Sequence, residues 1–363
     1  MKIIKLIYRI AFLVCLFWLA INTAKAHEAY LIEHDLFWDS LAKQFSGQAF
    51  EALNNPHNVN IFLFVSLAAT LLLTLNFLFR RTKFSLRLGA WQENFAHYGP
   101  HIVRFSVAIS LFFSAVQNVF LGPELPLSDF PFGSIVRVIL LAASILLFFG
   151  LFTEIAAFLG ITVFLLAMSV RGGYMFTYAN YFGEFIVLIL FGMRVFSLDK
   201  YLFGPLRQFR YWEKYETAIV RGFYGFGLIF AGLTVKFLHP ELTLQVVNDW
   251  HLTQFHWLFP SDPLLIVFGG GLAEIVIGLF IILGFEMRLM VAVSLFYITL
   301  SLLYFREQVW PHILMYGISL NLLLQPETLT LDHLFFAEHR KKLAWWRRIV
   351  KPHNILGKSE VKT

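Results

Sequence analysis

The sequence predicts an all-α protein that crosses a membrane several times. Its 363 residues are 58% hydrophobic and only 14% charged, whereas soluble domains carry roughly 25% charged residues. Several apolar runs reach the roughly 18 residues that are needed to cross the ~30 Å hydrocarbon layer. Lipid offers no water to the backbone polar groups, so these runs are expected to be helices rather than open sheets. The 42 Phe argue against a large soluble core as the alternative.

The first 26 residues have the three parts of a secretory signal peptide. A basic start is followed by an apolar stretch, and the end carries small residues in the pattern Ala24-Lys25-Ala26. We therefore expect residues 1–26 to be removed before His27, with an uncleaved signal anchor as the alternative. Cleavage would also remove Cys15, the only cysteine, and would leave no disulfide and no thiolate ligand.

Nine apolar segments of the remaining chain are expected to span the membrane as helices. Their ranges are 60–79, 101–121, 134–151, 154–170, 178–196, 219–238, 263–284, 287–304 and 311–325. Residues 27–59 would precede the first span as a periplasmic segment.

The distribution of basic residues orients these spans. The loops 80–100 and 197–218 and the tail beyond residue 325 are rich in Lys and Arg, whereas the loops 122–133 and 239–262 contain neither. Basic loops stay in the cytoplasm. The pattern therefore predicts a multi-pass protein of the bacterial inner membrane, with the mature N-terminus in the periplasm and the C-terminus in the cytoplasm.

The chain ends in a basic cytoplasmic tail, residues 337–363. It combines Lys and Arg with the pair Trp345 and Trp346. Such a segment next to a span is expected to lie on the anionic inner leaflet with its Trp rings at headgroup depth. We therefore expect the lipid bilayer, and not nucleic acid, as its partner.

One phrase of the sequence occurs twice. FLGPEL stands at 120–125 and FLHPEL at 237–242, and each copy ends an apolar run that opens with an arginine, Arg104 or Arg221. The two runs align without a gap. Both arginines fall near the inner helix ends, where we expect their long side chains to reach the interface.

The repetition extends beyond this phrase. Each half continues with two spans joined by a short turn at Gly150 or Gly284, and closes with SLDKYLFG or TLDHLFF. We interpret residues 101–204 and 219–336 as two tandem four-helix bundles. An even number of spans keeps the units parallel, related by an axis along the membrane normal. The segment 60–79 is one extra N-terminal span.

The second unit resembles a known family in its glycines and single polar positions. The run GGGLAEIVIGLFIILGFEMR at 269–288 carries most of them, and a Gly-x-x-x-Lys helix end precedes it. The positions are Gly232, Lys236, Glu274, Gly278, Gly284 and Arg288. In these the unit resembles the DoxX family, including the DoxD-type small subunit of thiosulfate:quinone oxidoreductase. The first unit departs from the pattern, because an apolar residue faces Glu274 and Val119 faces Lys236. The resemblance implies a redox-associated, quinone-linked membrane subunit.

Ionisable residues within hydrocarbon cost roughly 2.5–3.5 kcal/mol on insertion scales, so each one calls for a reason. Glu274 lies near the middle of its span among small residues that permit close helix approach. In a functional role, Glu274 would exchange protons or pair with a cation. In a structural role, it would form a hydrogen bond between two helices. Lys236 could pair with Glu274 or with Glu184, or extend to the interface. The candidates for catalysis surround a pocket in the outer half of the membrane. They are Glu274, Lys236, Glu184 and His312.

A quinone headgroup needs hydrogen-bond donors inside an apolar, aromatic slot. The polar or aromatic positions that we consider for contacts to it are Gln117, Asn118, Tyr181 and Arg288. The same pocket would suit a small solute.

Four histidines on the expected outer side are candidate metal ligands. They are His27, His34, His251 and His256. Imidazole nitrogens suit zinc or copper, and the amine of an N-terminal His27 would add a copper ligand. The alternatives are a helix at the interface for the second pair and an ordinary surface segment for His27.

Three functions remain open at this level. The first is a membrane subunit in quinone-linked electron transfer, which would serve a periplasmic redox partner. The second is a proton-coupled transporter of a metal or small solute, and the third is a non-catalytic scaffold for a periplasmic protein. The sequence contains no CxxCH haem attachment motif, no HExxH and no phosphate-binding GxxxxGK[ST].

Overall fold

The computed structural model describes residues 32, 34–43, 45–192, 197–203, 214–255, 259–325 and 328–336. The expected signal peptide, the metal candidates His27 and His256 and the basic tail 337–363 lie outside the described residues. Over the described ranges the regular elements are helices, apart from one short β-hairpin.

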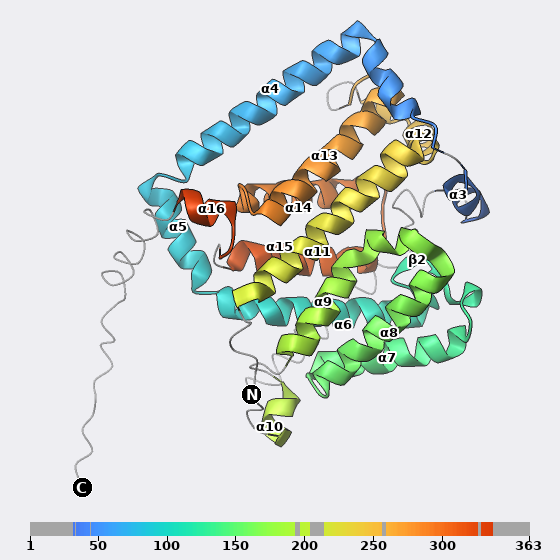
Figure 1. The fold of residues 1–363 in the computed structure, drawn as a ribbon, viewed down its shortest axis with the longest axis vertical. Helices are drawn as coiled ribbons and strands as arrows, with labels where there is room; N and C mark the ends of the chain where they lie inside the picture. The colour runs from blue at the N-terminus through green and yellow to red at the C-terminus, as the bar shows by residue number, and fades with distance from the viewer. Residues whose placement is uncertain are drawn as a thin grey trace.

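The first half of the chain contains the extra span and the helices of the first expected bundle (Figure 1). Its elements are α3 (His34–Leu41), η1 (Gln48–Asn54), α4 (Pro56–Phe79), α5 (Lys83–Glu93), η2 (Ala96–Tyr98), α6 (Gly99–Gln117), β1 (Val119–Phe120), β2 (Gly122–Pro126), η3 (Leu127–Asp129), α7 (Gly133–Phe149), α8 (Thr153–Arg171), η4 (Gly172–Tyr178), α9 (Ala179–Phe191) and α10 (Leu198–Phe203).

The second half repeats the order of helices from α6 onward, with the helix α12 in place of the hairpin. Its elements are α11 (Glu216–Ala231), the π-helical segment η6 (Gly232–Leu238), α12 (Pro240–Asp249), η7 (Leu252–Gln254), α13 (Pro263–Leu283), α14 (Met287–Tyr304), η8 (Trp310–His312), α15 (Ile313–Leu324) and α16 (Leu331–Phe335).

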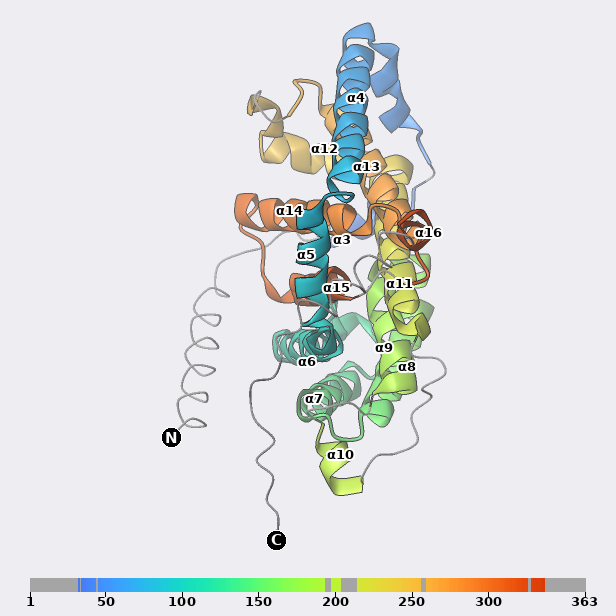
Figure 2. The ribbon, with the colours of Figure 1, turned by 90° about the vertical axis from the view of Figure 1, so that its left-hand side faces the viewer.

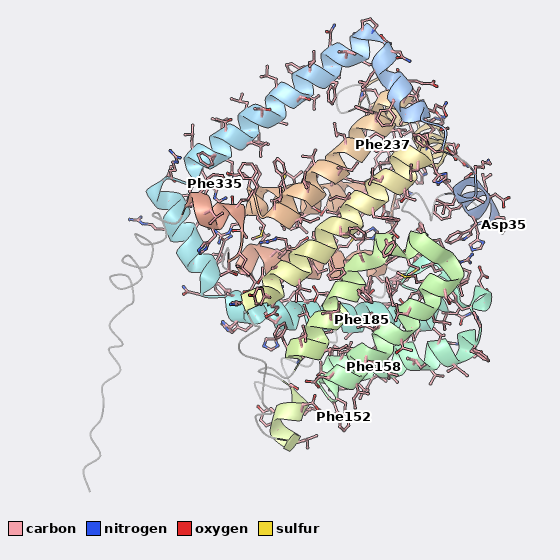
Figure 3. All side chains as sticks on the ribbon, viewed as in Figure 1. Asp35, Phe152, Phe158, Phe185, Phe237 and Phe335 are labelled. Atoms are coloured by element: carbon pink, nitrogen blue, oxygen red, sulfur yellow. The ribbon has the colours of Figure 1, made fainter. Side chains whose placement is uncertain are left out.

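Six helical stretches of the described chain are long and apolar enough to cross a membrane, and two further apolar helices, Gly133–Phe149 and Trp310–Leu324, are shorter. One of the six, Thr153–Phe191, consists of α8 and α9, which are joined by η4 and pack against each other. Many large apolar side chains point outward, among them Phe158 and Phe335, while Phe185 and Phe237 are buried (Figure 3). The protein is an all-α polytopic membrane protein.

The helices form two layers (Figure 2). One layer contains α8, α9, α11 and α13 side by side, and the other contains α7, α6, α15 and α14. Contacts of α7 with α8 and of α13 with α14 close the two ends. The two halves of the chain meet where α9 packs on α11 and α6 packs on α15.

The same hydrogen-bond arrangement occurs in both halves, after the turns at Gly150 and Gly284. The backbone amides of residues 152–153 donate to the Asp199 carboxylate over 2.7 and 3.2 Å, and those of residues 286–287 donate to Asp332 over 2.9 and 3.1 Å. A carboxylate is favourable at a helix N-terminus because it satisfies free amides and faces the positive end of the helix dipole. Each aspartate therefore ties the exit segment of its half to the start of α8 or α14.

The two repeated arginines are buried rather than extended to the interface. Arg221 donates from Nε to the carbonyl of Ile282 over 3.1 Å and from Nη2 to that of Leu329 over 2.8 Å. Arg104 lies against Gly150, and each arginine interacts electrostatically with the capping aspartate of its own half. Our expectation that they reach the interface is wrong, because each finds partners inside its own half.

The first repeated helix ends earlier than expected. α6 stops at Gln117, because Asn118 adopts the left-handed conformation and caps the helix with its amide. The following residues form an antiparallel hairpin instead of the last turn of a span, with Val119 opposite Pro126. This hairpin contains the first copy of the repeated phrase.

Candidate functional site

A cavity of about 190 Å³ lies where the two halves of the chain meet. Its first wall comes from η4 and α9, and its other walls come from α11, η6, α13, α14, η8 and α15. Five of its lining residues are tyrosines, which are Tyr174, Tyr178, Tyr181, Tyr224 and Tyr297. The cavity thus combines apolar walls with hydroxyl groups, as ligand pockets generally do.

An ion pair lies in this wall, between η6 and α13. Lys236 Nζ lies 3.0 Å from Glu274 Oε1, and Glu274 lines the cavity. Glycines permit the approach, because a Cβ atom at Gly271 would come within 2.9 Å of the Lys236 side chain. Of the two partners that the sequence left open for Lys236, the structure selects Glu274. π-helical turns such as η6 are frequent at functional sites.

The second ionisable pair of the cavity is His312 with Glu307. The imidazole Nε2 lies 2.9 Å from Glu307 Oε2, and Nδ1 lies 3.2 Å from the carbonyl oxygen of Gln308. A carbonyl only accepts, so Nδ1 carries a hydrogen. Ser301 donates to the other oxygen of Glu307, so this acid is held firmly beside the cavity.

Two tyrosines of the lining have fixed hydroxyl groups. Tyr224 lies 2.8 Å from Ser294 Oγ and 3.2 Å from Ser319 Oγ. The Tyr181 hydroxyl contacts Ser110 Oγ. Both rings are fully buried, and these partners hold them in place between α9, α11 and the neighbouring helices.

The cavity reaches the protein surface midway along two spanning helices. Tyr297, near the middle of α14, is 49% exposed although it lines the cavity. The side chain of Glu274, near the middle of α13, is 31% exposed. Both helices are long and apolar enough to cross a membrane.

Sequence reasoning missed two acids near the cavity, Glu307 and Glu124. Glu124 of β2 is only 3% exposed, and its Oε1 accepts from the Tyr174 hydroxyl over 3.0 Å and from the Tyr178 hydroxyl over 2.5 Å. Burial raises the pKa of Glu124 to about 7, against the opposing effects of these hydrogen bonds and of Arg171. The signal was present in the sequence, since Glu124 is the acid of the repeated phrase.

Several candidate residues lie away from this cavity. Gln117 and Asn118 are exposed at the end of α6, and Arg288 lies beside Gly89 of α5. None of the three is among the lining residues. The cavity does bring together three other candidates, Tyr181, Glu274 and His312. Lys236 joins them through its ion pair with Glu274.

Glu184 lines a second, smaller cavity of about 20 Å³. It follows Tyr181 by one turn of α9 and shares this space with Arg104, Glu216 and Asn321. Its Oε1 atom is buried and has no hydrogen-bond partner among the described residues. The small volume has room for about one water molecule.

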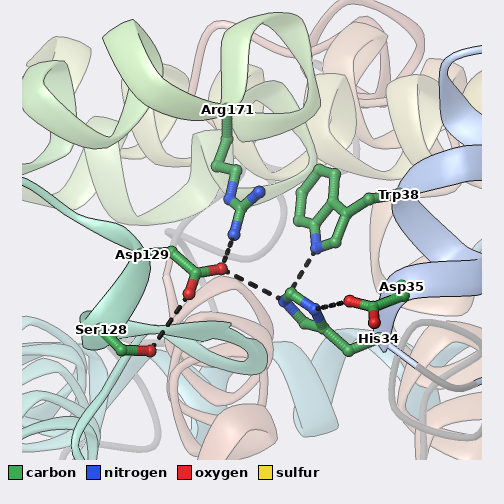
Figure 4. A network of polar contacts seen from close by, with 6 residues as sticks. All are labelled: His34, Asp35, Trp38, Ser128, Asp129 and Arg171. Carbon is green, nitrogen blue, oxygen red and sulfur yellow. Dashed lines mark hydrogen bonds and ion pairs between the residues drawn. The ribbon is translucent and has the colours of Figure 1, made fainter.

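The histidines proposed as metal ligands do not gather in the described structure. Figure 4 shows His34 in a polar network, where Nε2 accepts from Trp38 Nε1 over 3.1 Å and lies 3.4 Å from Asp129, which also pairs with Arg171. His251 lies in the turn after α12. Over the described ranges no group of three or more His, Cys, Asp or Glu is placed to hold a metal ion.

Comparison of the chain with family models, curated proteins and solved structures finds no match. The function is therefore argued from the geometry of the cavity.

Proposed function

We propose that the chain is the membrane subunit of a quinone-linked redox system and that the quinone headgroup binds in the cavity between the halves. The observation that carries this proposal is the opening of a polar, tyrosine-lined cavity at mid-depth of spanning helices, beside Tyr297 and Glu274. With these helices across the bilayer, a lipid-soluble ligand would enter there directly from the hydrocarbon region.

The size and chemistry of the cavity fit a quinone headgroup. The cavity of about 190 Å³ is much larger than the space of a single water molecule, and we compare it with one substituted ring, without the isoprenoid tail. The tail would extend through the opening into lipid. The Tyr297 hydroxyl in the lining and the Lys236 ammonium beside Glu274 are donors suited to carbonyl oxygens. A quinone supplies electron and proton transfer when bound, and a periplasmic redox partner would exchange the electrons.

We also propose that the chain consists of two parallel DoxX-like four-helix units, preceded by α4. Two observations support this proposal. In each half the four helices contact one another in a ring, α6 to α9 in the first and α11, α13, α14 and α15 in the second. The paired hydrogen bonds of Asp199 and Asp332 also recur at corresponding turns. The quinone cavity would then lie between two diverged copies.

The test is ligand binding with two variants on one helix. Ala273 lines the cavity, whereas Val276, three residues further along α13, is exposed on the outer face. Decylubiquinone should quench the aromatic fluorescence of the purified protein. Ala273→Leu fills the cavity and should weaken binding at least tenfold, while Val276→Leu should bind like the wild type. Equal affinities of the two variants would contradict the proposal, and quinone extracted from the purified wild type would support it.

Proton-coupled transport of a small solute is the second candidate. It is favoured by the loss of α-helical geometry at corresponding places in both halves. α6 ends at Gln117 and passes into the hairpin, and α11 ends at Ala231 and passes into η6. Transporters often bind their substrates at interrupted helices. Solute uptake into proteoliposomes driven by a pH gradient, without any effect of decylubiquinone, would favour this function.

A further inference from the structure

The two copies of the repeated phrase place their glutamates in different surroundings. Glu124 of the first copy is buried against two tyrosines of the cavity. Glu241, its counterpart in the second copy, has a side chain that is 34% exposed and lies 3.6 Å from His239. The aligned position of His239 in the first copy is Gly122. One copy has therefore diverged to hold a buried acid at the cavity.

Gly122 is required for this arrangement. A Cβ atom at this position would collide with the Tyr178 hydroxyl and with the Glu124 carboxylate. Only a glycine lets the hairpin backbone pass this close to the acid and its donor. The second copy has a histidine there and does not form the equivalent contact.

The carboxyl group of Glu124 is only partly satisfied. Both tyrosine hydroxyls donate to Oε1, while the buried Oε2 has no hydrogen-bond partner among the described residues. Tyr174 and Tyr178 also line the cavity. Each of them therefore connects the cavity to the acid by a single hydroxyl.

We propose that Glu124, Tyr174 and Tyr178 form a proton-binding site that serves the ligand in the cavity. This inference rests on the proposed function for the identity of the ligand. In the transfer, a ligand hydroxyl gives its proton to the Tyr178 oxygen while the Tyr178 hydroxyl gives its own to Glu124. One O–H bond breaks on the ligand and one forms on the carboxylate, and the tyrosine is unchanged at the end.

Charged and titratable groups around the site set its proton affinity. Arg171, at the end of α8, stabilises the charged form of Glu124 electrostatically, and it pairs with Asp129, which His34 also contacts. Tyr181 of α9 also interacts electrostatically with the acid. With a pKa of about 7, Glu124 is populated in both protonation states near neutral pH, which suits a group that must accept and release protons.

The experiment follows the protonated carboxyl band of the full-length protein by infrared spectroscopy in phosphatidylcholine nanodiscs as the pH is raised. In the wild type a band should disappear with a midpoint near pH 7. It should be missing in Glu124→Gln and retained in Glu241→Gln, which is the matched control from the second copy. Tyr178→Phe removes a donor to the carboxylate, so its midpoint should move to higher pH.

The outcomes separate this inference from the proposed function. A band with a midpoint near pH 7 that persists in Glu124→Gln, or a midpoint that Tyr178→Phe leaves in place, overturns the inference. The titration is repeated with decylubiquinone, whose binding is measured separately by fluorescence. A shifted midpoint supports the link to the cavity, and a bound ligand without any shift overturns it while the proposed function stands. If decylubiquinone does not bind, the proposed function fails, and the Glu124→Gln and Tyr178→Phe titrations still decide the inference.

Discussion

At the scale of single residues, the costly charges of the cavity are held in pairs. Lys236 lies beside Glu274, and His312 lies beside Glu307. A charge within the membrane is expensive unless it is paired. The sequence identified three of these four residues but left the partner of Lys236 open. The depth of each residue was estimated from a rise of about 1.5 Å per residue, which assumes a regular α-helix. The π-helical turn η6 changes both the rise and the rotation at Lys236.

The coupling between Lys236 and Glu274 is testable by a double-mutant cycle. Glu274→Gln leaves the ammonium without its 3.0 Å partner, and it should lower the free energy of unfolding by roughly 1–2 kcal/mol, between the values for exposed and buried pairs. Lys236→Met in the same chain removes the charge and should restore part of this loss. The measurement is reversible unfolding in mixed micelles. Additive effects of the two substitutions would show that the pair contributes nothing.

The two acids that the sequence did not reveal acquire their roles from different kinds of contact. Glu124 bonds Tyr174 of η4, which is 50 residues away along the chain. Glu307 contacts Ser301 of α14 and His312 of η8, which are close in sequence but belong to two different helices. No periodicity along the chain encodes such contacts. The repeated phrase shows that a glutamate occurs in both copies. It does not show that only Glu124 is buried, because this burial depends on the tertiary packing of the hairpin.

At the scale of elements, the apolar runs predicted the helices well. Each of the nine expected spans overlaps a helix of the described chain, because lipid permits little else for an apolar run. The turns at Gly150 and Gly284 were also predicted, and both glycines adopt a positive φ at helix ends. The ends of α6 and α11 were not predicted, since Asn118 and the π-helical turn interrupt runs that remain apolar beyond them.

The two capping aspartates should contribute separately to stability. Asp199→Ala and Asp332→Ala each expose backbone amides at a helix start, which should lower the free energy of unfolding by about 1–2 kcal/mol. The loss should be larger for Asp332, because its Oδ2 also lies 2.7 Å from Arg80 Nη1. Asp39→Ala, at an exposed position of α3, is the control. Melting temperatures in detergent provide the comparison, and a wild-type value for either capping variant would refute this account.

At the scale of the whole molecule, α4 is attached to the rest of the protein mainly near its ends (Figure 1). At one end Asn58 donates to Asp262 over 2.6 Å and to the carbonyl of Ala52 over 2.9 Å. At the other end Asn76 bonds Glu286, and Arg80 pairs with the capping Asp332. Between these ends the most apolar part of the helix has no buried residue. The extra span therefore lies along the edge of the two layers with most of its length exposed.

This attachment predicts an uneven response to substitution along α4. Asn58→Ala removes two hydrogen bonds at a buried position and should lower the free energy of unfolding by roughly 1–2 kcal/mol. Leu67→Ala and Leu71→Ala lie in the exposed middle and should change it by less than about 0.5 kcal/mol. Unfolding in mixed micelles compares the three variants. A large loss for either leucine would show that the middle of the helix packs against protein.

A helix fastened at both ends cannot adjust its tilt freely when the bilayer becomes thinner or thicker. With 24 residues, α4 is about 36 Å long at 1.5 Å per residue, and near its C-terminal end Asn76 bonds Glu286, where α14 begins. Hydrophobic mismatch on α4 would therefore pull on the start of the helix that carries Tyr297. A change in membrane thickness would in this way exert a force on the wall of the cavity.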